Sequence, residues 1–248
     1  MVRLHAKILA AALVSVSAIL LTGLTFAANT IAAPSSPMMV KASYKVYKAG
    51  IWIGTIEDQF VREGDNYKIV SETDTAGPLR LFLRDRLTVT SEGTIGAGGL
   101  RPGSYHFTRR NDQKKNISSI FDWDKRQLVS QHSGESEVFD LPAGTQDRLS
   151  ALYQFMFSVP RTSEVRLWMS QGKKVEQYRY RKLGEPVLTV NNESIPTVYY
   201  VRDAKEGESK AHLWLGTGKG KYYLPVKILF EDEHGGSFEQ MLVSLYTE

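Results

Sequence analysis

Apolar and polar residues alternate with a period of two through most of the chain after residue 37, and this pattern constrains the fold more than any other feature. In the first such segment, Val40, Ala42 and Tyr44 alternate with lysine and serine residues. Successive side chains of a β-strand point to opposite faces, so the pattern predicts a strand with one buried face. Similar segments recur as far as Tyr246, separated by short turns and without a repeated βαβ unit. The sequence therefore predicts a mainly β fold with antiparallel pairing.

One segment has a helical period instead. Its apolar residues fall at i, i+3, i+4 and i+7, on one face of a helix: Leu149, Leu152, Tyr153 and Met156. Thr145 or Asp147 can cap this helix, and Pro160 bounds its end. Because so short a helix gains most of its stability from packing, we expect it to lie against the sheet. The predicted architecture is a single curved antiparallel sheet or incomplete β-barrel with one short helix packed against it, in one domain over residues 34–248.

The first 33 residues have the order of a targeting segment. Two basic residues precede an apolar stretch from Ile8 to Leu24, and small residues and a polar turn follow. This order is typical of a secretory signal peptide, with cleavage after Ala27 or Ala32. The alternative is a retained membrane anchor, but the 17-residue stretch is at the lower limit for a span and contains serine, threonine and glycine. We therefore expect export to the periplasm and no integral membrane span in the mature form.

The chain of 248 residues contains no cysteine. Disulfides, cysteine-based zinc modules, iron–sulfur sites and thiol nucleophiles are therefore excluded, as is a lipid anchor of the bacterial type. The formal net charge is +4, and the two basic residues of segment 1–33 leave +2 for residues 34–248. With acidic residues interspersed among the basic ones, this charge predicts no nucleic-acid partner.

Sequence motifs for catalysis and metal binding are missing. The histidines show no metal-ligand spacing, and no GxSxG motif is present. The glycine-rich run from Gly216 to Lys221 is followed by Tyr222, whereas a phosphate-binding loop continues with serine or threonine into a helix. Acidic pairs such as Asp122 and Asp124 lie along turns, which gives no support for facing carboxylates in a cleft. The sequence therefore predicts no enzyme activity, no cofactor and no metal.

The strongest signal for binding is the content of aromatic residues, with 4 Trp, 12 Tyr and 10 Phe. Such residues can fill the core of a small barrel. Alternatively, they line an apolar cavity for an acyl chain, another lipid or a hydrophobic peptide. The candidate lining residues are Trp52, Trp123, Tyr153, Met156, Trp168 and Trp214. The sequence leaves both alternatives open.

Several strings together resemble the bacterial domain-of-unknown-function family 3108. They include Tyr44-Lys45-Val46-Tyr47, Gly99-Leu100-Arg101-Pro102, Phe121-Asp122-Trp123, Leu213-Trp214-Leu215 and Leu224-Pro225-Val226, and the most specific is Gly144-Thr145-Gln146-Asp147-Arg148-Leu149-Ser150-Ala151-Leu152-Tyr153. The resemblance implies an exported, mostly β protein, and it transfers no catalytic residues. At the level of architecture alone, the chain is also similar to periplasmic half-barrel carriers of lipoproteins and lipids.

Two residues at the start of the predicted helix, Gln146 and Asp147, are expected to be structural. Asp147 suits a helix N-terminus. We hypothesise that it also pairs with a strand arginine, namely Arg84, Arg86 or Arg109, although simple capping is an equal alternative.

The sequence thus predicts a periplasmic, non-enzymatic binding protein for cell-envelope maintenance. Its partner would be a hydrophobic ligand or an envelope protein. One alternative is a protein–protein interaction module with a filled barrel. The other is an enzyme that acts on cell-wall or polysaccharide material.

Overall fold

The computed structural model describes residues 36–77, 86–159, 162–203, 208–232 and 234–248. The predicted signal peptide lies outside these residues. None of the helices in the described ranges has the length and apolar character needed to cross a membrane.

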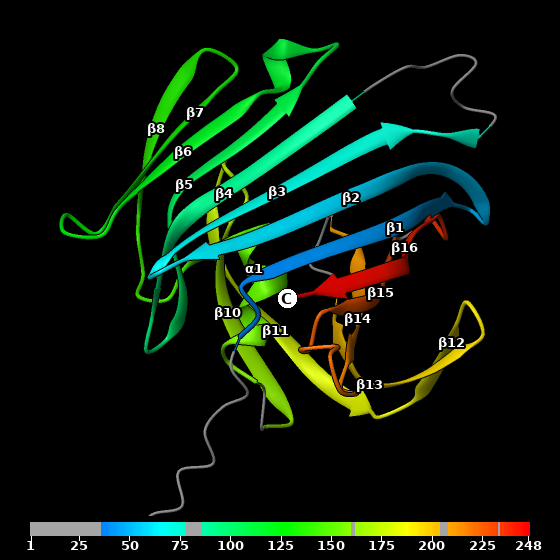
Figure 1. The fold of residues 1–248 in the computed structure, drawn as a ribbon. Helices are drawn as coiled ribbons and strands as arrows, with labels where there is room; N and C mark the ends of the chain where they lie inside the picture. Colours follow the sequence, from blue (N-terminus) through cyan, green and yellow to red (C-terminus); the bar gives the residue numbers. More distant parts are fainter. Residues whose placement is uncertain (1–35, 78–85, 160–161, 204–207, 233) are drawn as a thin grey trace, which may run out of the picture. The chain divides into compact units, whose positions relative to one another are not determined.

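The described residues form sixteen β-strands and three short helices (Figure 1). The strands are β1 (Met39–Lys48), β2 (Ile51–Glu63), β3 (Asn66–Thr75), β4 (Arg86–Gly96), β5 (Gly99–Arg109), β6 (Ile117–Asp122), β7 (Gln127–His132), β8 (Glu135–Asp140), β9 (Gln146–Asp147), β10 (Glu164–Ser170), β11 (Val175–Gly184), β12 (Val187–Val190), β13 (Glu193–Arg202), β14 (Lys210–Gly216), β15 (Pro225–Glu231) and β16 (Ser237–Thr247). The helices are the α-helix α1 (Ser150–Tyr153) and the 3₁₀ turns η2 (Gln113–Lys115) and η3 (Gln154–Met156).

The strands make one open sheet, in the order β8-β7-β6-β5-β4-β3-β2-β1-β16-β15-β14-β13-β11-β10-β9, with β12 paired to β13 beside this path. The pairing of β1 with β16 joins the two halves of the chain. Neighbouring strands are antiparallel except for the short parallel pair β9 and β10. The sheet is not closed, so the prediction of a curved antiparallel sheet with one short helix is confirmed.

The sheet curls so that its two ends approach each other across the inner face. The Nε2 atom of Gln146 in β9 donates a hydrogen bond of 2.8 Å to the carbonyl oxygen of Leu100 in β5. The hydroxyl of Ser130 in β7 donates to the carbonyl oxygen of Gly172, in the turn between β10 and β11. These contacts between strands far apart in the sheet order define an inner, concave face.

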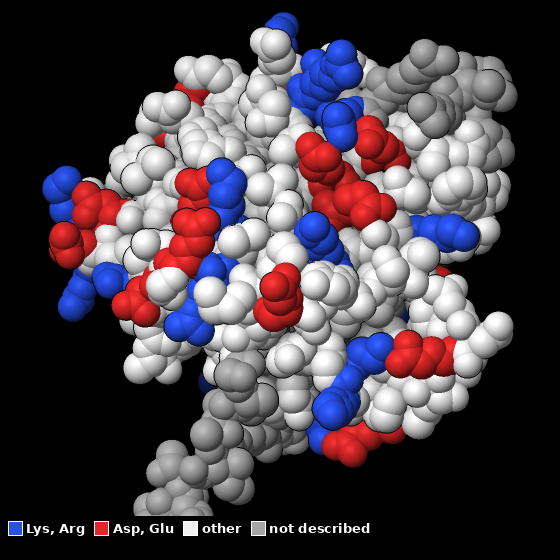
Figure 2. Space-filling view, in the orientation of Figure 1, with Lys and Arg blue, Asp and Glu red and all other residues white. Residues whose placement is uncertain are grey.

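The two faces of the sheet differ in polarity, as the alternation predicts. On β1, Val40, Ala42 and Tyr44 are buried on the inner face. The outer face of β2 to β4 carries cross-strand ion pairs, for example Lys68 with Glu92 at 2.7 Å. Figure 2 shows acidic and basic side chains interspersed on the face of the molecule in view. Water therefore solvates the outer face of these strands, and burial of the inner face stabilises the fold.

Two elements fill one end of the inner face. The α1–η3 segment inserts Leu149, Tyr153 and Met156 into the largest apolar cluster, as the helical period predicts. The hairpin of β12 and β13 places Val190 and Ile195 against inner-face residues of β1 and β16. The helix is shorter than predicted, because the chain tightens into the 3₁₀ turn η3 after Tyr153. We call this filled region the closed end.

Candidate functional site

Glutamine side chains on both sides of α1 fasten it to the turn between β4 and β5. The main-chain N–H of Leu100 donates to the Oε1 atom of Gln154 at 2.7 Å, and the Nε2 atom of Gln154 donates to the carbonyl oxygen of Gly98 at 2.7 Å. Gln146 binds the carbonyl oxygen of Leu100, as described above. Both glutamines therefore hold the start and the end of the helical segment on one turn of the sheet.

Asp147 is buried at the start of α1 and caps it. Its Oδ1 atom accepts hydrogen bonds of 2.8 Å from the main-chain N–H groups of Leu149 and Ser150. The hydroxyl of Ser150 in turn accepts from the main-chain N–H of Asp147 at 3.0 Å, which completes a reciprocal cap. The Oδ2 atom accepts from the hydroxyl of Ser91 in β4 at 2.6 Å. Burial raises the pKa of the Asp147 carboxyl, and the hydrogen bonds oppose this shift.

The contacts of Asp147 among the described residues agree with the capping alternative rather than with an ion pair to Arg86. A hydroxyl and two main-chain amides satisfy the carboxylate, which is the simple capping alternative. Arg86 pairs on the outer face with Glu72 at 2.8 Å, and Arg84 lies outside the described residues. Local amides reach a helix N-terminus without any long side chain, and a pair with Arg84 stays a prediction.

A second buried carboxyl, Asp58 of β2, lies beneath α1. The hydroxyl of Tyr153 donates to its Oδ2 atom at 3.2 Å, whereas its Oδ1 atom has no hydrogen-bond partner among the described residues. Burial raises the pKa of Asp58 to about 6, although hydrogen bonds from Ser71 and Tyr153 oppose the shift. Burial and the nearby Asp58 also raise the pKa of Tyr44. The helix covers this carboxyl, and the hydrogen bond from Tyr153 fastens the helix to β2.

The opposite end of the inner face carries two phenylalanines that solvent reaches. Phe230 of β15 and Phe238 of β16 are cross-strand partners, and they are 37% and 41% exposed. They lie on the same face as the buried residues Ile228 and Leu242 of the same strands. We call Phe230 and Phe238 the open-end pair, since the inner face is buried at the closed end and accessible here.

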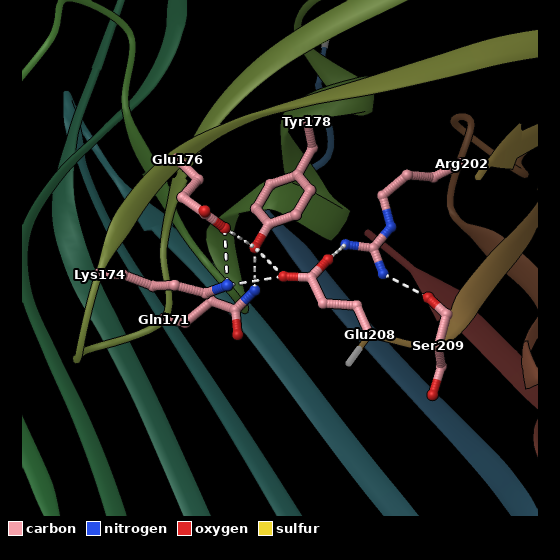
Figure 3. A network of polar contacts seen from close by, with 7 residues as sticks. All are labelled: Gln171, Lys174, Glu176, Tyr178, Arg202, Glu208 and Ser209. Atoms are coloured by element: carbon pink, nitrogen blue, oxygen red, sulfur yellow. Dashed lines mark hydrogen bonds and ion pairs between the residues drawn. The ribbon is translucent and has the colours of Figure 1, made fainter. Parts of the chain in front are cut away.

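A charged network joins the β10–β11 hairpin to β13 and β14 (Figure 3). Glu208 lies at its centre and accepts from the Nζ atom of Lys174 at 2.6 Å and from the Nη1 atom of Arg202 at 3.0 Å. The Arg202 guanidinium stacks over the ring of Tyr178, with 4.7 Å to the ring centroid. Glu176 also pairs with Lys174 at 2.7 Å. Two positive and two negative groups thus neutralise one another, so the network holds two parts of the curled sheet together.

Replacing Glu208 with alanine is expected to lower the free energy of unfolding by about 2 kcal/mol, because Arg202 and Lys174 lose their shared acceptor. The side chains of Arg202 and Glu208 are only 11% and 15% exposed. Glu185→Ala is the matched control, because Glu185 pairs with Lys182 at the surface, where ion pairs contribute well under 1 kcal/mol. Urea unfolding measures both variants, and equal losses would contradict the role given to Glu208.

The structure distributes the six predicted cavity residues over different surroundings. Tyr153 and Met156 lie in the core at the closed end, and Trp123 packs beside them against Phe121. Trp168 is half-buried on β10. The remaining two, Trp52 and Trp214, lie on the outer face. The six side chains do not form one cavity.

The two outer tryptophans each have a local cause. Val46 of β1 pairs with Gly54 of β2, and Tyr47 pairs with Trp52, so Ile53 is left without a partner and forms a β-bulge. The bulge shifts the alternation of β2 by one residue. The Trp52 ring therefore lies on the outer face, beside the Lys45 side chain. In β14, Trp214 alternates with the buried Leu213 and Leu215. It stacks on Tyr199 at 4.4 Å, and His212 extends the stack. These rings stabilise the outer face of the sheet.

Sequence reasoning missed Asp58 and the open-end pair. Asp58 stands between Ile56 and Phe60 in the alternation of β2, on the face that is otherwise apolar. An aspartate at an otherwise apolar position of the alternation therefore indicates, from the sequence alone, a buried polar group. The exposure of Phe230 and Phe238 has no such signal, because it depends on how the sheet curls.

In the described residues, no group of three or more His, Cys, Asp or Glu side chains is placed to hold a metal ion.

The fold and its contacts define a class of protein with an open, curled antiparallel sheet, a helical segment packed inside it and one accessible end. The chain belongs to the family "Protein of unknown function (DUF3108)", whose model matches residues 43–243. The resemblance to this family is thereby confirmed.

Two solved structures are similar to the chain. One is a β-barrel-like protein of the domain of unknown function DUF1849 from Brucella abortus, with a TM-score of 0.56 and 8% identity over 85% of this chain and 98% of that one. This match shows a shared fold. The other, a lipoprotein candidate from Parabacteroides distasonis ATCC 8503, has a TM-score of 0.36 and 9% identity over 86% of this chain and 97% of that one. No curated protein matches the sequence.

Proposed function

We propose that the protein is a non-enzymatic binding protein of the periplasm that holds the acyl chain of a lipid at the open end of its curled sheet. The observation that carries this proposal is the open-end pair, two adjacent aromatic rings on the inner face that remain accessible to solvent. Large apolar side chains on a concave surface are typical of ligand sites. The order of the first 33 residues supports export.

The position of the open-end pair favours a chain-like ligand. Phe230 pairs across the sheet with Ala211, and Phe238 pairs with Lys48, so the two rings have a small side chain on one flank and a basic one on the other. A folded partner cannot easily follow a concave face, whereas an acyl chain can lie along it. Lys48 is exposed and carries a charge that suits an anionic headgroup.

The interior carboxyls support a binding role over catalysis. Asp58 and Asp147 are the titratable acids that lie on the inner face beside α1, and both are fully covered. A general acid or base must come within hydrogen-bond reach of its substrate. Their hydrogen bonds instead fasten the helix that closes one end of the sheet.

The double substitution Phe230→Ser and Phe238→Ser is expected to weaken binding of cis-parinaric acid, a fluorescent fatty acid, at least tenfold. A tenfold change corresponds to about 1.4 kcal/mol, less than the burial of one phenylalanine ring contributes. Fluorescence titration measures the affinity. The control Val138→Ser removes an exposed apolar residue from the outer face of β8 and is expected to leave the affinity unchanged. Equal affinities of the two variants for cis-parinaric acid would overturn the proposal. A protein that binds an envelope protein and no lipid would instead fit the alternative of a protein–protein interaction module.

A further inference from the structure

The outer face of β5 to β8 carries no charged side chain over its central part. Strand register places nine residues there: Ser104, His106, Thr108, Ser118, Ile120, Val129, Gln131, Ser136 and Val138. The outer face of β2 to β4 on the same sheet is dense in ion pairs, such as Lys68 with Glu92 and Arg86 with Glu72. Depletion of charge on one part of a surface is typical of a contact area rather than of a solvated face.

Part of this face is hollowed into a trough of about 520 Å³. Four polar residues cross its floor in register, one from each strand: His106, Ser118, Gln131 and Ser136. Because neighbouring strands lie about 4.8 Å apart, the row is about 14 Å long. Gln113 and Asn116 border it on the side of η2, and the Ser133–Gly134 turn borders it on the side of β8.

The floor of the trough offers hydrogen-bonding groups that the protein does not use. Within the described ranges, the side chains of His106, Ser118, Gln131 and Ser136 make no hydrogen bond to another residue. Hydroxyl, amide and imidazole groups can each donate and accept. A ligand with many neutral hydroxyl or amide groups can therefore pair with all four.

An exposed apolar row runs beside the polar one. Ile120, Val129 and Val138 are cross-strand neighbours, and Ile120 and Val138 are 50% and 59% exposed. Sugar rings combine polar hydroxyl groups with apolar C–H faces. The two parallel rows therefore match both surfaces of such a ligand.

Other ligand classes fit the trough less well. No lysine or arginine lines it, so it lacks the cations that anions require, and Glu135 is its one acid among the described lining residues. A strand added to the edge of β8 would meet Glu135 and Glu137, and charges at an edge strand oppose such pairing. We propose that this trough binds a neutral glycan, at a site separate from the open-end pair.

The test is a calorimetric titration of the whole protein with chitotetraose, a neutral oligomer of N-acetylglucosamine, and with maltotetraose. At least one oligosaccharide is expected to bind, and the double substitution Ser118→Ala and Gln131→Ala to weaken that binding at least fivefold. Both residues lie at the surface, so the variant is expected to fold. The control Gln59→Ala makes the glutamine substitution alone, on the outer face of β2, and is expected to leave the affinity unchanged.

The variant at Phe230 and Phe238 separates this site from the proposed acyl-chain site. Glycan binding that persists in that variant supports two independent sites, whatever the outcome with fatty acids. The proposal is overturned if neither oligosaccharide binds at millimolar concentration, or if the Ser118 and Gln131 variant binds as tightly as the control.

Discussion

Replacing Tyr153 with alanine is expected to lower the free energy of unfolding by about 3–5 kcal/mol, the range for large aromatic truncations in a core. The side chain is 1% exposed, and its ring stacks on Phe60 with 5.8 Å between centroids. The substitution removes this packing and also the hydroxyl that binds Asp58. The helix α1 then loses its central contact with the sheet.

Two controls make the Tyr153 result specific. Tyr153→Phe removes the hydroxyl alone and is expected to cost about 1 kcal/mol. Tyr246→Ala makes the same truncation at an exposed position and is expected to cost less than that. Urea unfolding monitored by tryptophan fluorescence gives all three values. A loss at Tyr153 no larger than that at Tyr246 would show that α1 is not a structural part of the core.

Replacing Asp58 with asparagine is expected to remove a penalty of up to about 3 kcal/mol that the buried carboxylate imposes on folding at pH 7. The pKa of Asp58 rises from 3.8 to about 6 on folding, so the folded state binds its proton more tightly than the unfolded state. Stability therefore falls as the pH rises from about 4 to about 6, and it stays lower above that range. Asparagine carries no charge, and its oxygen can still accept from Tyr153. Its amide nitrogen takes the place of Oδ1, which has no partner among the described residues, so part of the gain is lost at every pH.

Unfolding of the wild type and of Asp58→Asn as a function of pH measures this effect. The stability of Asp58→Asn relative to the wild type is expected to be about 3 kcal/mol higher above about pH 6 than below about pH 4. Asp124→Asn, at an exposed turn after β6, is the control and is expected to change stability little at any pH. A stability difference that does not grow between pH 4 and pH 6 would contradict the raised pKa of Asp58.

The strands and the packed helix could be predicted from the sequence because their signals are local. The alternation at Val40, Ala42 and Tyr44 depends only on neighbouring residues, and so does the spacing of Leu149, Tyr153 and Met156. Asp147 as a helix cap is equally local. Each of these features follows from the geometry of one strand or one helical turn.

The spatial arrangement of the candidate residues could not be predicted, because it depends on the curl of the sheet. A single bulge residue, Ile53, sends Trp52 to the outer face, and alternation alone does not reveal it. Phe230 and Phe238 meet because β15 and β16 pair in one register, and solvent reaches them only because nothing described covers that end. The trough over β5 to β8 likewise requires the register of four strands.

Native mass spectrometry of the protein purified from its own cell envelope tests the proposed function most directly. The wild type and Val138→Ser are expected to carry an additional mass that dissociates as a lipid, and the double variant Phe230→Ser and Phe238→Ser to lack it. A wild type that emerges without bound lipid, or a double variant that retains the lipid, would contradict binding of an acyl chain at the open-end pair.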